Sequence, residues 1–147
     1  MLRYRPMHYA DIEQVALLAS KLHVRPWSLE QITEALSLPR YACHVAVSGH
    51  QVAGYYIASH GLDVSDLLTI GVSPDYQRQS IASNLLNHLK QLTRLNENRD
   101  IFLEVRQSND AAIALYHKMG FCQVGLRKQY YQTPDGIEDA ITMICSL

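Results

Sequence analysis

The chain has 147 residues, of which 48% are hydrophobic and 18% charged, so it is the size of one ordinary domain with the composition of a folded globular protein. Its 13 basic and 14 acidic residues give a formal net charge of −1, which argues against a broad basic surface for nucleic acid. No apolar run is long enough to cross a bilayer, and residues 1–14 lack the apolar core of a signal peptide. We therefore expect a cytoplasmic protein without a membrane partner.

Neither the cysteines nor the histidines suggest a metal site. Cys43, Cys122 and Cys145 have no metal-ligand spacing, and the seven histidines are scattered without an H-x-x-x-H pair. We interpret the cysteines as small, mostly buried apolar side chains in a reducing compartment.

The first third of the chain predicts one strand and two helices. A strand over residues 2–5 ends at Pro6, and Asp11 is placed to cap a helix with an apolar face between residues 12 and 22. Ser28 then caps a second short helix, with Gln31 completing a capping box, and that helix ends before Pro39. The apolar stripes are narrow, which indicates a flank or lid.

The rest of the chain alternates strands and helices. Strands over 41–48 and 51–60 join through the turn Gly49-His50, and a short buried strand follows over 67–72. A helix from 80 to about 95 leads to a strand over 101–106, and the next helix closes on Gly120. Strands over 121–131 and 138–147 complete an α/β (α+β) fold. We predict one domain over 1–147, antiparallel at first, with a parallel βαβ unit in its second half.

The strand, polar loop and helix between residues 67 and 86 predict an anion site. Several backbone N–H groups converge where such a loop enters a helix, at the positive end of the helix dipole, and Arg78 adds a cation. Gly71 lies inside the strand, a position that often marks close approach by another backbone-like group.

Three further side chains are candidates for chemistry. Glu104 interrupts an apolar strand, and it is either a general base at the end of a parallel strand or simply paired with Arg106. Tyr116 has the spacing of a core aromatic with a bonded hydroxyl. Asn109 is placed to cap a helix, and its side chain also suits a ligand contact.

Two stretches resemble the GNAT acetyltransferase superfamily. The run DYQRQSIASNLL resembles its acyl-CoA motif, Q/R-x-x-G-x-G/A, which residues 77–82 occupy here. The run LEVRQSNDAAIALYHKMGF is similar to the second half of that fold. With PWS at 26–28 and YYQTPDGIEDAITM near the end, the chain is similar over nearly its whole length to bacterial members that acetylate the N-terminal alanine of a small-subunit ribosomal protein.

The resemblance implies a GNAT fold whose two parallel strands splay, with acetyl-CoA as co-substrate and a protein N-terminus as acceptor. It implies that Glu104 is the general base and Tyr116 the acid that protonates the leaving thiolate, while Tyr130 and Tyr131 hold the peptide. The implied cofactor contacts are Ile70, Gly71, Val72 and Asn109 for the arm, and the backbone of Arg78, Gln79, Ser80, Ile81, Ala82 and Ser83 for the pyrophosphate.

Ser80 departs from the motif, which has glycine there. We expect cofactor binding to be retained, with Ser80 as helix N-cap and hydroxyl donor to a phosphate. Two other functions remain open: acetylation of lysine or a small amine, and a non-catalytic CoA-binding interaction module.

Overall fold

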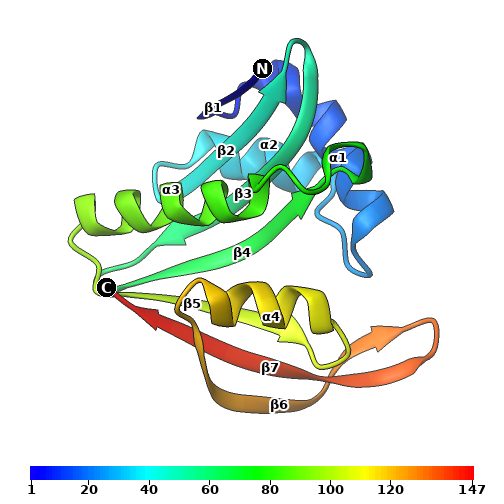
Figure 1. Ribbon diagram of the computed structural model, residues 1–147, viewed down its shortest axis with the longest axis vertical. Coiled ribbons are helices and arrows are strands. Elements are labelled where there is room, and N and C mark those ends of the chain that lie inside the picture. Colours follow the sequence, from blue (N-terminus) through cyan, green and yellow to red (C-terminus); the bar gives the residue numbers. More distant parts are fainter.

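One seven-stranded sheet runs through the computed structural model, which describes residues 1–147, and helices cover both of its faces (Figure 1). The strands are β1 (Leu2–Pro6), β2 (Tyr41–Ser48), β3 (Gln51–His60), β4 (Val64–Val72), β5 (Asp100–Arg106), β6 (Cys122–Thr133) and β7 (Gly136–Ser146). The helices are α1 (Ile12–Leu22), α2 (Leu29–Ser37), α3 (Ile81–Leu95) and α4 (Asp110–Lys118), with 3-10 turns at Tyr9–Asp11 and Pro74–Tyr76.

The predicted mixed sheet is confirmed. Its strand order is β1-β2-β3-β4-β5-β7-β6; β1 to β4 are antiparallel, and β4 and β5 form the parallel pair. The turn between β2 and β3 is the predicted one, and Gly49 adopts the left-handed φ of 61° that the tight hairpin requires. The strand predicted from Leu67 begins earlier, at Val64.

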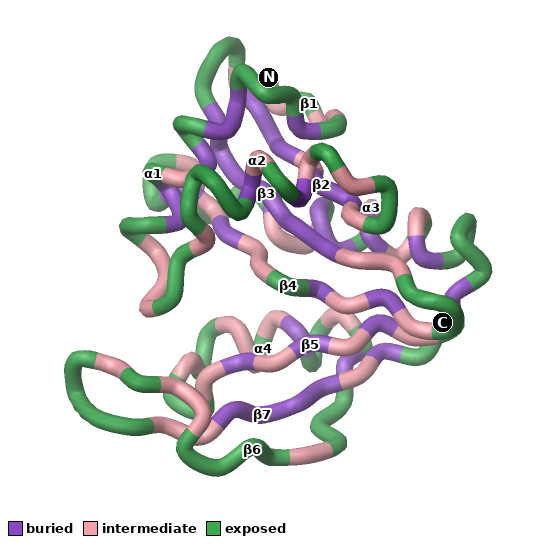
Figure 2. The backbone as a smooth tube through the Cα atoms, turned by 180° about the vertical axis from the view of Figure 1, so that it is seen from behind, coloured by how far each residue is buried: buried purple, intermediate pink, exposed green.

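Two separate apolar cores attach the helices to the sheet. One lies under α3 and α4 and contains Leu85 and Leu103, and the other lies under α1 and α2 and contains Val15 and Ile32. Figure 2 shows buried backbone concentrated along the central strands. The first two helices, predicted as a flank or lid, thus cover one face of β2 and β3. No helix has the length and apolar character needed to cross a membrane.

Gly54 on β3 sets the position of the start of α3. A Cβ at this residue would lie 2.9 Å from Cγ2 of Ile81 and 3.1 Å from the carbonyl oxygen of Gly71. Because glycine leaves this space free, the first turn of α3 packs directly on the sheet beside the end of β4.

The N-caps predicted for α1 and α2 differ in outcome. Ser28 and Gln31 form the expected capping box, with N–H···O distances of 3.1 and 2.9 Å. Asp11 stands at the N-cap position of α1 but makes no side-chain cap bond, so that prediction was wrong. Its carboxylate instead binds the Arg5 guanidinium at 2.7 and 3.0 Å and accepts the His8 N–H, and hydrogen bonding from Arg5 lowers the pKa of Asp11.

His44 is a residue of β2 whose side chain contacts His88 of α3, and its Nδ1 is buried without a hydrogen-bond partner. Its ring stacks on Tyr56, with centroids 5.2 Å apart, and lies 4.3 Å from the ring of His88. Burial, reinforced by His88 and His60, lowers the pKa of His44 from 6.5 to about 4. The unfolded chain therefore binds a proton near pH 6.5 that the folded protein does not bind until about pH 4.

We predict that the free energy of unfolding falls by up to about 3 kcal/mol through His44 as the pH decreases from about 6.5 to 4, with the full stability present above pH 6.5. Urea unfolding at several pH values measures this dependence. His44→Gln removes the titrating group and should lose clearly less stability over the same range. Equal losses for the two proteins would contradict the prediction.

Candidate active site

The two parallel strands part soon after they begin. β4 and β5 pair only between Val64–Asp66 and Asp100–Phe102. Beyond Asp66, this edge of β4 has no paired strand. Each keeps its other neighbour, β3 for β4 and β7 for β5. Figure 1 shows the two strands diverging from the end of the sheet near the C-terminus. Backbone groups of β4 that face the gap therefore have no strand partner.

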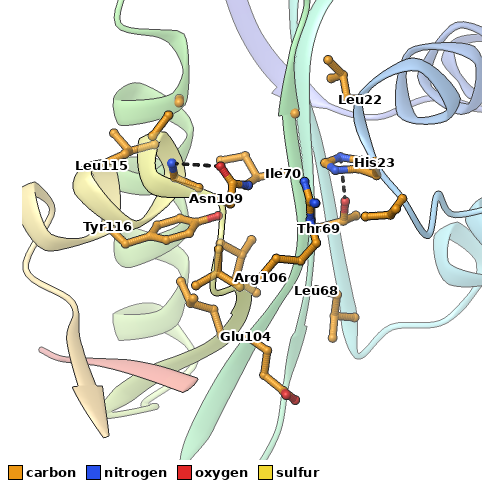
Figure 3. A pocket seen from close by; sticks show the side chains of 18 of the residues that line it. Leu22, His23, Leu68, Thr69, Ile70, Glu104, Arg106, Asn109, Leu115 and Tyr116 are labelled. Atoms are coloured by element: carbon orange, nitrogen blue, oxygen red, sulfur yellow. Dashed lines mark hydrogen bonds between the residues drawn. The ribbon is translucent and has the colours of Figure 1, made fainter. Parts of the chain in front are cut away.

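A cavity of about 430 Å³ occupies this gap (Figure 3). Its walls are the second half of β4, the end of β5, the first two turns of α4 and the connection between α1 and α2. Most of the lining is apolar, and the polar groups in it include His23, Thr69, Glu104, Arg106 and Asn109. An apolar cavity with a few converging polar groups is typical of a small-molecule site.

Ile70, Gly71 and Val72, which are the predicted contacts of the cofactor arm, line the cavity. The interpretation of Gly71 needs a correction, because the group that approaches it is not backbone-like. A Cβ there would lie 2.8 Å from both Leu22 Cδ1 and Tyr55 Cε1. Gly71 therefore allows β4 to pack against a fully buried tyrosine on the α1 side.

The loop before α3 adopts a left-handed backbone at two non-glycine residues, with φ of 64° at Arg78 and 58° at Ser80. Ser80 stands at the N-cap of α3 but makes no side-chain cap bond, so the predicted capping role of its hydroxyl was wrong. The left-handed φ explains why the motif has glycine at this position. Such turns direct successive N–H groups into one concavity, which suits an anion.

The other predicted residues of this loop divide into two groups. Gln77 and Ala82 line the cavity, whereas Arg78, Gln79, Ser80 and Ser83 lie outside its lining. The Ile81 side chain is buried against Gly54, so only its backbone is left for a ligand.

Asn109 caps α4 as predicted and also lines the cavity. Its Oδ1 accepts the Ala112 N–H at 3.3 Å, which leaves the side-chain NH₂ free to donate to a ligand.

Tyr116 combines a core ring with a hydroxyl that faces the cavity. The ring packs on Phe121, with centroids 5.7 Å apart, and only 7% of the residue is exposed. In Figure 3 the hydroxyl points from α4 into the cavity. Burial, with a smaller contribution from Tyr131, raises the pKa of Tyr116 well above 10. The hydroxyl therefore holds its proton at neutral pH.

Glu104 contacts a different cation from the one considered in the sequence. Arg106 pairs with Glu138 at 3.4 Å, and Glu104 instead faces Arg127 of β6, whose Nε lies 3.4 Å from its Oε2. That oxygen is buried and receives no hydrogen bond. A buried carboxylate oxygen without a donor is costly, so this oxygen is suited to accept a hydrogen bond from a cationic or N–H group.

The Glu104 carboxylate and the Tyr116 hydroxyl lie on opposite faces of the sheet. Leu103 and Val105 belong to the core under α3 and α4 together with Tyr116, so Glu104 between them points to the other face. Figure 3 shows the Glu104 carboxylate directed away from Tyr116. Both side chains line the same cavity because the gap passes through the sheet.

A hydrogen-bonded trio on the α1 side was not found from the sequence. His23 Nε2 lies 2.8 Å from the Tyr55 hydroxyl, and Thr69 Oγ1 lies 3.3 Å from that hydroxyl and 3.4 Å from His23 Nε2. Burial lowers the pKa of His23, and the nearby Arg106 adds to this effect. The three residues come from separate parts of the chain, so no local sequence pattern predicts their contact.

Two loops meet over the same side of the gap. Arg25, from the connection between α1 and α2, donates to the Tyr130 carbonyl and stacks over Tyr130 and Tyr131 at 5.1 and 5.2 Å from the ring centroids. Tyr131 lines the cavity, as a peptide-holding residue would, whereas Tyr130 lies outside the lining. The gap is thus bordered by polar and aromatic groups on the side of Glu104.

Comparison with known proteins identifies the family. The model of the acetyltransferase (GNAT) family matches residues 9–121. The [ribosomal protein bS18]-alanine N-acetyltransferase of Escherichia coli K12 is 38% identical over 133 residues, which cover 90% of this chain and 89% of that protein.

Solved structures agree with this result. The crystal structure of the ribosomal-protein-S18-alanine N-acetyltransferase from Escherichia coli is 34% identical, with a TM-score of 0.91 over 99% of this chain and 94% of that one. Arabidopsis thaliana NAA60 in complex with acetyl-CoA has a TM-score of 0.89 over 100% and 99% of the chains, and at 20% identity it shows the fold alone.

We predict that Ser80→Gly stabilises the protein by about 0.5–1 kcal/mol, because glycine adopts the left-handed backbone without strain. Urea unfolding measures the change. Ser83→Gly, in the first turn of α3, is the matched control and should destabilise by a similar amount. A Ser80→Gly protein less stable than the wild type would contradict the assignment of strain to this residue.

Proposed function

The chain belongs to the acetyltransferase (GNAT) family and uses acetyl-CoA as acetyl donor, and we propose that its acceptor is the α-amine of a small-subunit ribosomal protein that begins with alanine. The observation that carries this proposal is the buried Oε2 of Glu104, which has no hydrogen-bond donor and borders the gap in the sheet. An ammonium group is the partner that such an oxygen lacks. The 38% identical relative named for this acceptor supports the choice.

The residues around the gap fit acetyl-CoA. The unpaired edge of β4 at Ile70 to Val72 suits the peptide-like pantetheine arm, which can bind as an added strand. Backbone N–H groups of the left-handed turn before α3, from Arg78 to Ser83, would hold the pyrophosphate. The free NH₂ of Asn109 would contact the arm. Bound acetyl-CoA supplies a thioester carbonyl that an amine can attack.

Glu104 would act from the acceptor side as general base. An α-ammonium has a pKa near 8, so a carboxylate that removes its proton, directly or through one water, gives enough help at neutral pH. Amide groups of β4 that face the gap would polarise the carbonyl oxygen.

Tyr116 would act from the opposite face as general acid. Burial keeps its hydroxyl protonated, and the hydroxyl points into the cavity, so it can donate a proton to the departing thiolate. The open sheet lets base and acid serve one reaction centre from two faces.

We also propose that residues 1–147 form this one acetyltransferase domain and that it works in the cytoplasm. The family match ends at residue 121, but β7 lies between β5 and β6 in the same sheet. Ribosomal proteins are synthesised in the cytoplasm, which is where such an acceptor is available.

We predict that acetyl-CoA and a short peptide beginning with alanine yield a product acetylated on its α-amine, located by fragment mass spectrometry. A peptide with a blocked N-terminus and a free lysine is the control and should stay unmodified. Acetylation of lysine alone would show that the acceptor is a lysine side chain and not the α-amine. Acetyl-CoA binding without transfer to any amine would favour a non-catalytic module.

We predict that Glu104→Gln lowers kcat at pH 7 by about tenfold to a hundredfold, because the amide cannot accept the proton. Steady-state kinetics with the alanine peptide measures this, and an unchanged kcat would remove Glu104 from the role of base.

For Tyr116→Phe we expect a loss of kcat of about tenfold or more with acetyl-CoA affinity nearly unchanged, measured by calorimetry. An equal loss of affinity would show that the hydroxyl serves binding or packing.

A further inference from the structure

The first side chain of the acceptor must fit on the α1 side of the gap. Glu104 points to that side, so an amine that meets its Oε2 lies there as well. In an α-amino acid the side chain is attached to the carbon that carries the amine, and it therefore enters the same part of the cavity. The residues that line the cavity there decide which first residues can reach the base.

A bulge in β4 turns Leu68 toward this part of the cavity. Ile57 and Ala58 are consecutive on β3, but they pair with Thr69 and Leu67, so Leu68 is an extra residue without a partner. Its side chain lines the cavity and is 40% exposed, and Figure 3 shows it on the same side of β4 as Thr69. A bulge beside an active site commonly re-aims one side chain, and here that side chain is a leucine on the acceptor side.

His23 forms a second wall, and its ring is held in place. Its Nε2 lies 2.8 Å from the Tyr55 hydroxyl of β3 and 3.4 Å from Thr69 Oγ1 of β4. The Tyr55 ring is fully buried and meets the His23 ring edge to face, with centroids 6.3 Å apart. β4 packs directly against Tyr55 at Gly71, where a Cβ would lie 2.8 Å from Tyr55 Cε1. A ring anchored to two strands in a close-packed region has little freedom to move aside.

These two walls lie across the gap from the strand that carries Glu104. Arg106, which ends β5, is close enough to His23 to contribute to the lowering of its pKa. In Figure 3, Leu68 lies on the side of β4 toward which the Glu104 carboxylate is directed. The whole cavity has a volume of about 430 Å³ and must also hold the arm of acetyl-CoA, so only a small part of it is left for the acceptor.

We propose that Leu68 and His23 are specificity-determining residues that restrict the first residue of the acceptor to a small side chain such as that of alanine. A methyl group fits beside the fixed ring and the leucine, whereas a long side chain such as that of methionine has to displace one of them. Packed walls resist such extra atoms, because side chains must leave their preferred rotamers to make room. The inference rests on the proposed function, in which the acceptor is an α-amine that meets Glu104.

The test compares two peptides that differ only in their first residue, alanine or methionine. The quantity measured is the ratio of kcat/KM for the methionine peptide to kcat/KM for the alanine peptide. In Leu68→Ala and in His23→Ala this ratio should rise about tenfold or more above that of the wild type, because the shortened side chain leaves room for the longer first residue. Both values come from the same protein sample, so a substitution that merely destabilises the fold leaves the ratio unchanged.

Leu17→Ala is the matched control, because it removes the same atoms from an exposed leucine of α1 that lies outside the lining of the cavity. Its ratio should equal that of the wild type. An unchanged ratio in both Leu68→Ala and His23→Ala would overturn the inference, and so would a wild type that acetylates the two peptides equally well, a result that retains the α-amine as acceptor. A wild type that binds acetyl-CoA but acetylates neither α-amine would instead overturn the proposed function.

Discussion

The structure depends on the early parting of β4 and β5, which are no longer paired after their first three residue pairs. A backbone group buried without a partner costs about 1–3 kcal/mol, so the gap must remain accessible to water or to a ligand. The fold tolerates the gap because β3 holds β4 and β7 holds β5 along nearly their whole lengths. The cavity and the free strand edge both follow from this parting.

The gap also joins two faces that a continuous sheet would keep apart. Tyr116 belongs to the core under α3 and α4, whereas Glu104 points to the side of α1. Each face has its own apolar core, so the helices stay fixed while the opening between them is left free. Glycines contribute at two points, since Gly54 admits Ile81 and Gly71 admits the Tyr55 ring. These close approaches hold the free edge of β4 in place.

Local signals predicted the elements well, and side-chain partners less well. The capping box of Ser28 and the N-cap of Asn109 depend on residues within one turn, and both are present. Asp11 failed as a cap because Arg5, brought near by β1, competes for its carboxylate. Arg106 was the nearest cation to Glu104 along the strand, but β7 presents Glu138 to it.

The order of strands and helices, the parallel βαβ unit and the family could be predicted from the sequence, because these depend on local periodicity and contiguous motifs. The resemblance to the GNAT superfamily implied that Glu104 and Tyr116 belong to one site, and both side chains line the cavity. Two contacts could not be predicted and are seen only in the folded protein: Arg127 faces Glu104, and His23, Tyr55 and Thr69 form one network. Those contacts join residues 14 to 46 positions apart, or two strands away, and sheet register and packing set them.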